Sequence, residues 1–191
     1  MPKIVDHDRR RAELAEVAFH AFAETGYAAT SMRALAERAG VSTGTLYHYF
    51  PDKSAILAQM FAAVVAADQA RFAEDVPMSL PVAERLPRLL AYVQRNAPHL
   101  RDVVRVALEV HRHAPVEGSL TDLRLALQGY RDSTAQALDL DDGGLIRVAF
   151  AYLVGSLIQD LLDPSDHPGV PEGLLAGLWA QFAVPAAGGA R

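Results

Sequence analysis

The chain has 191 residues with a net charge of −5; 51% of them are hydrophobic and 21% are charged, which is ample for the packed core of one large or two small domains. It has no cysteine, and this excludes disulfides, thiol catalysis and thiolate metal sites. Residues 1–11 are charged, and the longest uncharged apolar run, residues 148–159, is shorter than the roughly 20 residues of a membrane-spanning helix, so we expect a cytoplasmic protein without a signal peptide or a membrane contact.

The hydrophobic pattern predicts helices throughout, because no segment alternates apolar and polar residues as a strand does. The first helix is expected over residues 8–25 and is stopped by Gly26. Thr30 and Ser31 are good N-cap residues for a short second helix, which Gly40 ends by taking a left-handed conformation. The apolar stripe of this second helix consists of Met32, Leu35, Ala36 and Ala39.

A third helix, capped by Ser42, has an unusual composition. Only Leu46 and Phe50 have the spacing of inward-facing anchors, and Pro51 then ends the helix. The other positions are small residues or aromatic residues with polar tips: Thr43, Gly44, Thr45, Tyr47, His48 and Tyr49. Small residues allow close approach to base edges in a DNA major groove about 12 Å wide, and hydroxyl groups bind phosphates or bases. The pattern favours a DNA-reading helix-turn-helix over an ordinary helical hairpin with a polar outer face.

The same residues carry a family resemblance. The first 55 residues or so are similar to the DNA-binding domain of TetR/AcrR-type transcriptional regulators. The matching segments are residues 22–27 (FAETGY), 30–33 (TSMR), 36–42 (AERAGVS) and 44–53 (GTLYHYFPDK). The resemblance implies an all-α protein whose second, more variable domain binds an effector and forms a homodimer.

Operator DNA is the expected partner of the first domain. Arg33, Thr43, Thr45 and Tyr47 are expected at base edges or nearby phosphates, and Thr30, His48, Tyr49 and Lys53 at phosphates. The full set of predicted DNA-binding residues adds the two caps and the glycine: Thr30, Ser31, Arg33, Ser42, Thr43, Gly44, Thr45, Tyr47, His48, Tyr49 and Lys53. Residues 1–54 hold equal numbers of acidic and basic side chains, which favours a few placed contacts over non-specific coating of DNA. The cluster 9–11 (RRR) is either a set of phosphate contacts or a solvated helix start.

The rest of the chain is also predicted to be helical, giving about nine helices in total. A long fourth helix is expected over residues 52–74, capped by Asp52, with later helices over 82–96, 99–113, 120–137, 142–162 and 171–182. Ser119 or Thr121 is the expected cap of the helix over 120–137. The predicted domains are residues 1–54 for DNA binding and 55–184 for effector binding and dimerisation, followed by a disordered tail over 185–191.

In regulators that this chain resembles, the helices between about residues 82 and 137 hold a ligand cavity. The aliphatic character of this region favours an apolar or amphipathic effector. The candidate lining residues are Tyr92, Gln94, Asn96, His99, Arg105, Glu109, His111, His113, Gln128 and Tyr130. Glu109 and His113 share a helix face but lack a third ligand, so we expect a solvated helix end and no metal site there.

The predicted helix over 142–162 is apolar nearly all round, so it must face both its own core and something else. The resemblance implies that the last two helices pair with their symmetry mates in a four-helix dimer interface; a fully internal core helix is the alternative. The expected interface residues are Tyr152, Leu153, Ser156, Leu157, Leu175, Leu178, Trp179 and Phe182. A dimer would place two recognition helices on two half-sites about 34 Å apart.

The prediction is therefore a DNA-binding transcriptional regulator, commonly a repressor in the resembling family, which a small effector releases from a pseudo-palindromic operator. No nucleophile–base pair and no glycine-rich phosphate loop is apparent in the sequence, so we expect neither an enzyme nor a cofactor. The alternative is a DNA-binding regulator or architectural factor without a small-molecule effector.

Overall fold

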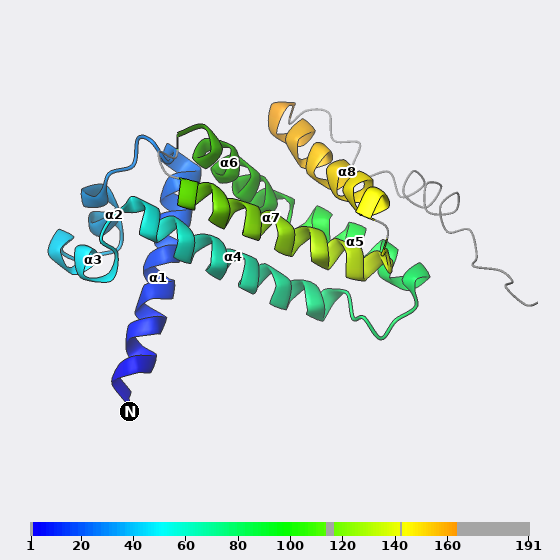
Figure 1. Cartoon of the computed structure of the whole chain (residues 1–191), viewed down its shortest axis with the longest axis horizontal. Coiled ribbons are helices and arrows are strands. Elements are labelled where there is room, and N and C mark those ends of the chain that lie inside the picture. The colour runs from blue at the N-terminus through cyan, green and yellow to red at the C-terminus, as the bar shows by residue number, and fades with distance from the viewer. Residues whose placement is uncertain (1, 114–116, 142, 164–191) are drawn as a thin grey trace, which may run out of the picture.

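The computed structural model describes residues 2–113, 117–141 and 143–163, and this part of the chain is all α-helical with no strand. Figure 1 shows two short helices, Met32–Arg38 and Thr43–Tyr49, at one end of the molecule and a bundle of longer helices beside them. The two short helices form the short-helix unit. The helices are α1 (Pro2–Thr25), α2 (Met32–Arg38), α3 (Thr43–Tyr49), α4 (Lys53–Asp75), α5 (Val82–Arg95), α6 (Ala97–His113), α7 (Glu117–Leu138) and α8 (Gly143–Leu162).

The helix boundaries follow the sequence signals closely, with two corrections. Helix α1 begins at Pro2, well before the predicted start at residue 8. Helix α7 begins at Glu117, so neither Ser119 nor Thr121 lies at its cap, because both positions fall inside the helix. The predicted helix over 171–182 and the tail over 185–191 lie outside the described residues.

Three predicted caps are present in the short-helix unit. The side chain of Ser31 accepts the Ala34 amide at 3.1 Å, that of Ser42 accepts the Thr45 amide at 3.0 Å, and Asp52 caps α4 in the same way. These oxygens satisfy amides that have no partner within the helix. Gly40 follows α2 with a φ of +66°, which a side chain would strain, so it turns the chain between α2 and α3.

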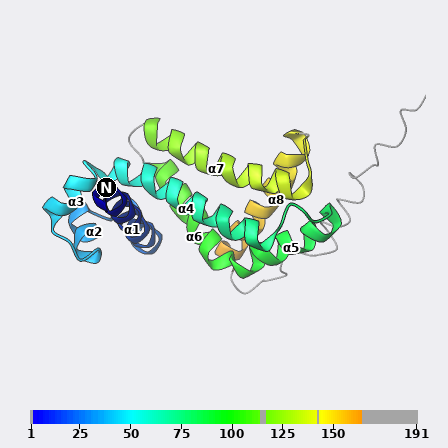
Figure 2. The same ribbon diagram turned by 90° about the horizontal axis from the view of Figure 1, so that it is seen from below.

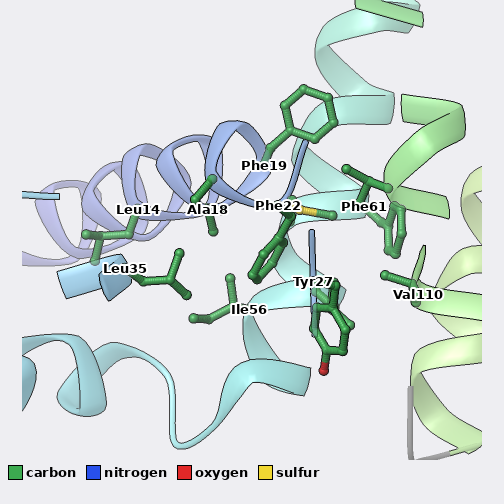
Figure 3. Packing of buried hydrophobic residues seen from close by; sticks show 14 of the residues in the cluster. Leu14, Ala18, Phe19, Phe22, Tyr27, Leu35, Ile56, Phe61 and Val110 are labelled. Carbon is green, nitrogen blue, oxygen red and sulfur yellow. The ribbon is translucent and has the colours of Figure 1, made fainter. Parts of the chain in front are cut away.

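The first hydrophobic core joins the short helices to the bundle. Figure 3 shows Phe22 of α1 pointing between Leu35 of α2 and residues of α4, with Val110 of α6 closing the far side. Ile56, Leu57, Met60 and Phe61 of α4 are buried in the same core, together with residues of α7. Because one core includes side chains of α1, α2, α3, α4, α6 and α7, a movement of α4 or α6 changes the packing under α2 and α3. The domain boundary between residues 54 and 55 stays a prediction.

The second core lies farther along the bundle, between α4, α5, α6, α7 and α8. In Figure 2, α4 and α7 run side by side over most of their length. Gly129 makes this approach possible, because a Cβ there would lie 2.9 Å from Val65 Cγ1. Helix α5 has the clearest amphipathic pattern of the bundle and buries Leu86, Leu89, Leu90 and Val93 in this core.

Helices α4 and α8 are long and apolar enough, by length and composition alone, to cross a membrane. Each of these helices includes charged residues, so no uncharged apolar run within them reaches the roughly 20 residues of a membrane-spanning helix. For α4 the apolar composition has another cause, because this helix supplies buried residues to both cores. A core helix passes the same test as a membrane span, so the two helices are weak evidence of membrane contact.

Candidate nucleic-acid interface and internal cavity

Helix α3 presents a polar face to solvent at the end of the molecule remote from the bundle (Figure 1). Its anchors Leu46 and Phe50 are buried, at 2% and 0% exposure, and fix the helix on the first core. The predicted contact residues on the opposite side are exposed, and Tyr49 is half-buried. The exposed set is Ser42, Thr43, Gly44, Thr45, Tyr47 and His48. The arrangement leaves a row of hydroxyl and aromatic groups available to a groove.

Arg33 on α2 is exposed, and within the described part of the chain its guanidinium has no hydrogen-bond or ion-pair partner. Arg38 differs, because it makes two hydrogen bonds to the Glu24 carboxylate, at 2.6 and 2.5 Å. The Arg38 hydrogen bonds hold the pKa of Glu24 below its usual value. Arg33 is therefore available to a base or phosphate, whereas Arg38 ties α2 to α1.

Thr30 is not available to DNA, and its predicted phosphate contact is corrected. It is only 4% exposed. Its hydroxyl donates to the Gly26 carbonyl oxygen at 2.7 Å and lies 2.7 Å from Thr25 Oγ1. The hydroxyl stabilises the turn between α1 and α2, and the sequence could not distinguish this role from that of a cap or a phosphate ligand.

Lys53 has a structural role that the sequence did not reveal. Its Nζ donates to the carbonyl oxygens of Tyr27 (2.6 Å) and Thr30 (2.9 Å) and lies 4.2 Å from the centre of the Tyr27 ring. Burial lowers the pKa of Lys53. An ammonium group has three protons, so at most one remains for a phosphate. The ammonium group of Lys53, at the start of α4, thus stabilises the turn between α1 and α2.

The three arginines at residues 9–11 make two kinds of contact: two of them form ion pairs and the third packs on an aromatic ring. Arg9 and Arg10 pair with Glu13 on exposed turns of α1, at 3.7 and 2.8 Å. Arg11 instead lies over the Phe50 ring, 5.2 Å from its centre. Close by, the His7 ring is 4.7 Å from the Tyr49 ring and 6.0 Å from the His48 ring. The first half of α1 therefore supports α3 directly.

The bundle encloses a cavity of about 310 Å³, near the lower end of the roughly 300–1,000 Å³ common for small-molecule sites. Its wall comes from five helices, α4 to α8. The apolar lining residues are Phe72, Leu89, Val93, Leu100, Val103, Val104, Ala107, Leu108, Leu123, Leu127, Phe150, Leu153, Val154, Leu157 and Ile158. The polar ones are Asp68, Gln69, Tyr92, His111, Tyr130, Ser133 and Thr134. Leu108 and Leu127 are exposed, so the cavity reaches the surface beside them.

The structure places Tyr92, His111 and Tyr130 of the predicted set on the cavity wall, and His99 directly behind it. The remaining predictions are corrected. Asn96 turns back to cap α5 through the Tyr92 carbonyl oxygen, at 2.8 Å, and Gln94 and Gln128 are exposed. Arg105 donates to the Ala23 carbonyl oxygen at the end of α1, and the Glu109 carboxylate lies beside Gly26. His113 lies beside Glu109 at the end of α6.

Asp68 of α4 is the residue that the sequence analysis missed. It is 2% exposed and lines the cavity. Its Oδ1 lies 2.9 Å from His99 Nε2, and its carboxylate also accepts hydrogen bonds from Arg71 and the Tyr130 hydroxyl. One signal in the sequence marks it: the acid falls on the apolar stripe of α4, where a leucine or valine would continue the pattern.

The hydrogen bonds keep this buried carboxyl charged. Burial by itself would raise the pKa of Asp68, but the donors His99 and Tyr130 outweigh it and hold the pKa below its usual value. Burial and the Asp68 charge in turn raise the pKa of Tyr92 to about 12 and also raise that of Tyr130. The cavity wall therefore presents one negative charge and neutral tyrosines.

Helix α6 lies between the cavity and the short-helix unit. Leu100, Val104 and Ala107 on one side line the cavity, whereas Val106 and Val110 belong to the first core. On this second side Arg105 donates to the Ala23 carbonyl oxygen at 3.2 Å, at the end of α1. A ligand that displaces α6 would therefore also move its contacts with α1.

Two of the predicted dimer residues face inward. Leu153 and Leu157 are 6% and 7% exposed and line the cavity, so their assignment to the interface is corrected. Tyr152 and Ser156 are half-buried, and the Ser156 hydroxyl donates to the Leu153 carbonyl oxygen at 2.8 Å. The predicted interface residues Leu175, Leu178, Trp179 and Phe182 lie outside the described residues.

Another side of α8 is open to solvent among the described residues. Val148 is 57% exposed and Leu162 is 79% exposed, and a Cβ on Gly155 would meet open space. An apolar helix side of this kind suits contact with another apolar surface.

At the end of α6, His113 Nε2 lies 3.9 Å from Glu109 Oε2, and no described residues form a group of three ligands suited to a metal ion.

The geometry of α1 to α4 agrees with a known family. Residues 14–60 match the family described as bacterial regulatory proteins, tetR family. The N-terminal domain of this chain is a TetR-family domain. The match includes α2, α3 and the first turns of α4, and thus all the predicted DNA-binding residues.

Individual proteins are also similar to this chain. The transcriptional regulator PksA of Bacillus subtilis is 33% identical over 105 residues, which are 54% of this chain and 51% of PksA. The chain aligns with about half the length, or less, of the curated relatives that it matches. The fold extends further: NemR of Escherichia coli in reduced form has a TM-score of 0.69 at 21% identity over 91% of this chain and 96% of NemR. FadR of Bacillus subtilis, solved in complex with stearoyl-CoA, has a TM-score of 0.64 at 22% identity, over 87% and 96%.

Proposed function

We propose that this chain is a sequence-specific, DNA-binding transcriptional regulator that acts as a homodimer in the cytoplasm and is released from its operator by a small molecule bound in the cavity. The observation that carries the proposal is the exposed face of α3. Its hydroxyl and aromatic side chains stand on a helix that two buried anchors, Leu46 and Phe50, hold rigidly on the first core. This is the arrangement that a recognition helix needs in order to enter a major groove.

The comparisons support this proposal. PksA is named a transcriptional regulator, and AcnR of Corynebacterium diphtheriae, 37% identical over 87 residues, is named a repressor. The FadR neighbour binds stearoyl-CoA, so a molecule of this fold accommodates a small ligand. In this chain the corresponding place for a ligand is the cavity between α4 and α8.

The proposed mechanism is a linkage between two sites. Helix α4 lines the cavity with Asp68 and Phe72, and its N-terminal end holds the α1–α2 turn through Lys53. A ligand that binds better to a second conformation of α4 and α6 shifts the short helices, and the two recognition helices of the dimer then no longer match the half-sites. Such coupling is typically worth about 1–3 kcal/mol and is reciprocal.

The test is selection of random duplex DNA by the purified full chain, with sequencing of the bound pool. We expect enrichment of a pseudo-palindrome, because a two-fold dimer reads two copies of one half-site. A Thr43→Ala, Tyr47→Ala variant is the matched control, since both side chains are exposed and their loss leaves the core unchanged. The variant should lose this enrichment. If the native chain enriches no repeated half-site even after refolding without ligand, or if the variant enriches the same half-site as strongly, the proposal is wrong.

A further inference from the structure

The cavity wall offers a ligand few free hydrogen-bond donors. The Ser133 hydroxyl donates to the Gly129 carbonyl oxygen at 3.0 Å, and the Thr134 hydroxyl donates to the Tyr130 carbonyl oxygen at 3.0 Å. The hydroxyls of Tyr92 and Tyr130 both donate to Asp68, to its carbonyl oxygen and its carboxylate respectively. A ligand therefore meets hydrocarbon over most of the wall, and the hydroxyl protons are already in use.

Asp68 is the exception, because it is an acceptor with a net charge. Among the described lining residues it is the single acid, and no lysine or arginine lines the cavity with it. A carboxylate has about four lone-pair positions. Arg71 and His99 donate to Oδ1, and Tyr130 donates to Oδ2, from which the same His99 nitrogen lies 3.1 Å. A ligand therefore binds this buried anion by taking the place of one of these donors.

The cation that now neutralises Asp68 comes from outside the cavity. Arg71 belongs to the next turn of α4, and its side chain is 51% exposed, whereas that of Asp68 is 2% exposed. A positively charged group inside the cavity would take over the neutralising role, and Arg71 would be free to return to water. Exchange of one cation for another leaves no buried charge unpaired, which is the costly outcome for an ion in a protein interior.

We propose that the ligand of the cavity is an apolar molecule carrying a protonated amine, and that the Asp68 carboxylate binds the amine. This inference rests on the proposed function of the cavity as an effector site. It also disfavours a class of ligands, since a fatty acid or another anionic amphiphile would bring a second negative charge next to Asp68 with no lysine or arginine on the wall to compensate. The expected effector therefore differs in charge from the acyl-CoA held by the FadR neighbour.

The experiment compares two probes of equal chain length, octylamine and octanoate, at pH 7. Each displaces the neutral dye Nile red from the full chain, and the dissociation constants follow from the loss of fluorescence. We expect octylamine to bind at least about tenfold more tightly than octanoate, because hydrogen bonds to charged groups are among the strong ones. In Asp68→Asn the preference should fall below about threefold.

Asp75→Asn is the matched control, because Asp75 lies on the same helix and pairs with Arg95 at 2.8 Å, away from the cavity wall. It removes the same charge and should keep the full preference for the amine. Tyr130→Phe is a second variant, which frees an acceptor position on Asp68 while the carboxylate stays; octylamine should bind to it at least as tightly as to the native chain.

Several results would overturn the inference: equal affinity for the two probes, a preference that survives in Asp68→Asn, or a tenfold loss of octylamine binding in Tyr130→Phe. The last variant applies even if Asp68→Asn does not fold.

Nile red binding that is lost in Leu157→Arg would show that the dye occupies the cavity. If Nile red binds in this way and neither probe displaces it, the amine is rejected but the cavity remains a ligand site. Failure of Nile red itself would count against the effector site and thus against the proposed function.

Discussion

The ring of His99 packs on the ring of Phe19, with 5.4 Å between their centres, while its Nε2 lies 2.9 Å from Asp68 Oδ1. Phe19 belongs to α1 and to the core beneath the short helices, and Asp68 belongs to the cavity wall. One imidazole therefore contacts both the first core and the cavity wall. A ligand that donates a hydrogen bond to Asp68 also changes what holds His99 against α1.

His99→Phe should weaken the coupling between ligand and DNA. The phenyl ring keeps the packing on Phe19 but cannot donate a hydrogen bond to Asp68. The fold should therefore survive, while the link between the cavity wall and the first core is lost. The measurement is the ratio of duplex affinities with and without cavity ligand, which we expect to fall below about threefold from a typical 5–150-fold. His113→Phe, on the same helix but beside Glu109, is the control and should keep the native ratio. A native ratio in His99→Phe would remove the residue from the connection.

Asp68 should make the fold sensitive to acid. A carboxyl whose pKa is lower in the folded than in the unfolded chain adds stability above its unfolded pKa, and this stability is lost as the pH falls through the folded pKa. The ordinary value is 3.8 and the folded pKa of Asp68 lies below it, so the loss is expected below about pH 4. Urea unfolding followed from pH 7 to pH 3 should show a steeper decline for the native chain than for Asp68→Asn. Parallel curves for the two proteins would show that the charge of Asp68 adds nothing to stability.

Arg33 and Lys53 should differ when each is replaced by alanine. Arg33 is exposed and unpaired among the described residues, so its loss should leave the unfolding free energy unchanged and reduce discrimination between duplexes by about 1–3 kcal/mol. Lys53 donates to two carbonyl oxygens, so Lys53→Ala should destabilise the fold by roughly 1–3 kcal/mol.

The salt dependence of DNA binding separates the two possible roles of Lys53. If the lysine acts through the α1–α2 turn, the slope of affinity against salt should change by much less than the unit or so expected for a lost phosphate contact. A flattening by a full unit, with unchanged stability, would restore the phosphate role predicted from the sequence.

The exposed side of α8 should control the proposed dimer. Val148→Asp places a charge on this side, and we expect a shift to monomers in analytical ultracentrifugation with little loss of Nile red binding. Leu153→Ala is the counterpart, since it should alter the cavity and leave the oligomeric state unchanged. The opposite pattern would return Leu153 to the interface, as the sequence analysis assigned it.

Local signals were sufficient to predict the short-helix unit. Ser31, Ser42 and Asp52 cap their helices and Gly40 turns between them, because each acts on residues a few positions away. The cavity depends instead on distant partners. Asp68 meets His99 and Tyr130, which lie 31 and 62 positions away, so its role could not be inferred from neighbouring residues.

Burial explains the other errors of prediction. Thr30 and Lys53 are polar, which suggested phosphate contacts. The Thr30 hydroxyl instead donates to a carbonyl oxygen in its own turn, and Lys53 donates to carbonyl oxygens more than 20 positions away. Helix α8 is apolar on all sides, so its sequence did not distinguish the side that lines the cavity, with Leu153 and Leu157, from the side that is exposed. Periodicity identifies an apolar helix but not the partner of each side.

The central claim is that cavity occupancy and DNA binding are coupled in one molecule. The most direct measurement is the affinity of the chain for its selected duplex with the cavity empty and with it saturated, together with the ligand affinity with and without duplex. The account predicts that the ligand weakens duplex binding by about 5–150-fold and that the duplex weakens ligand binding by the same factor. Equal affinities in the presence and absence of the other partner would contradict it.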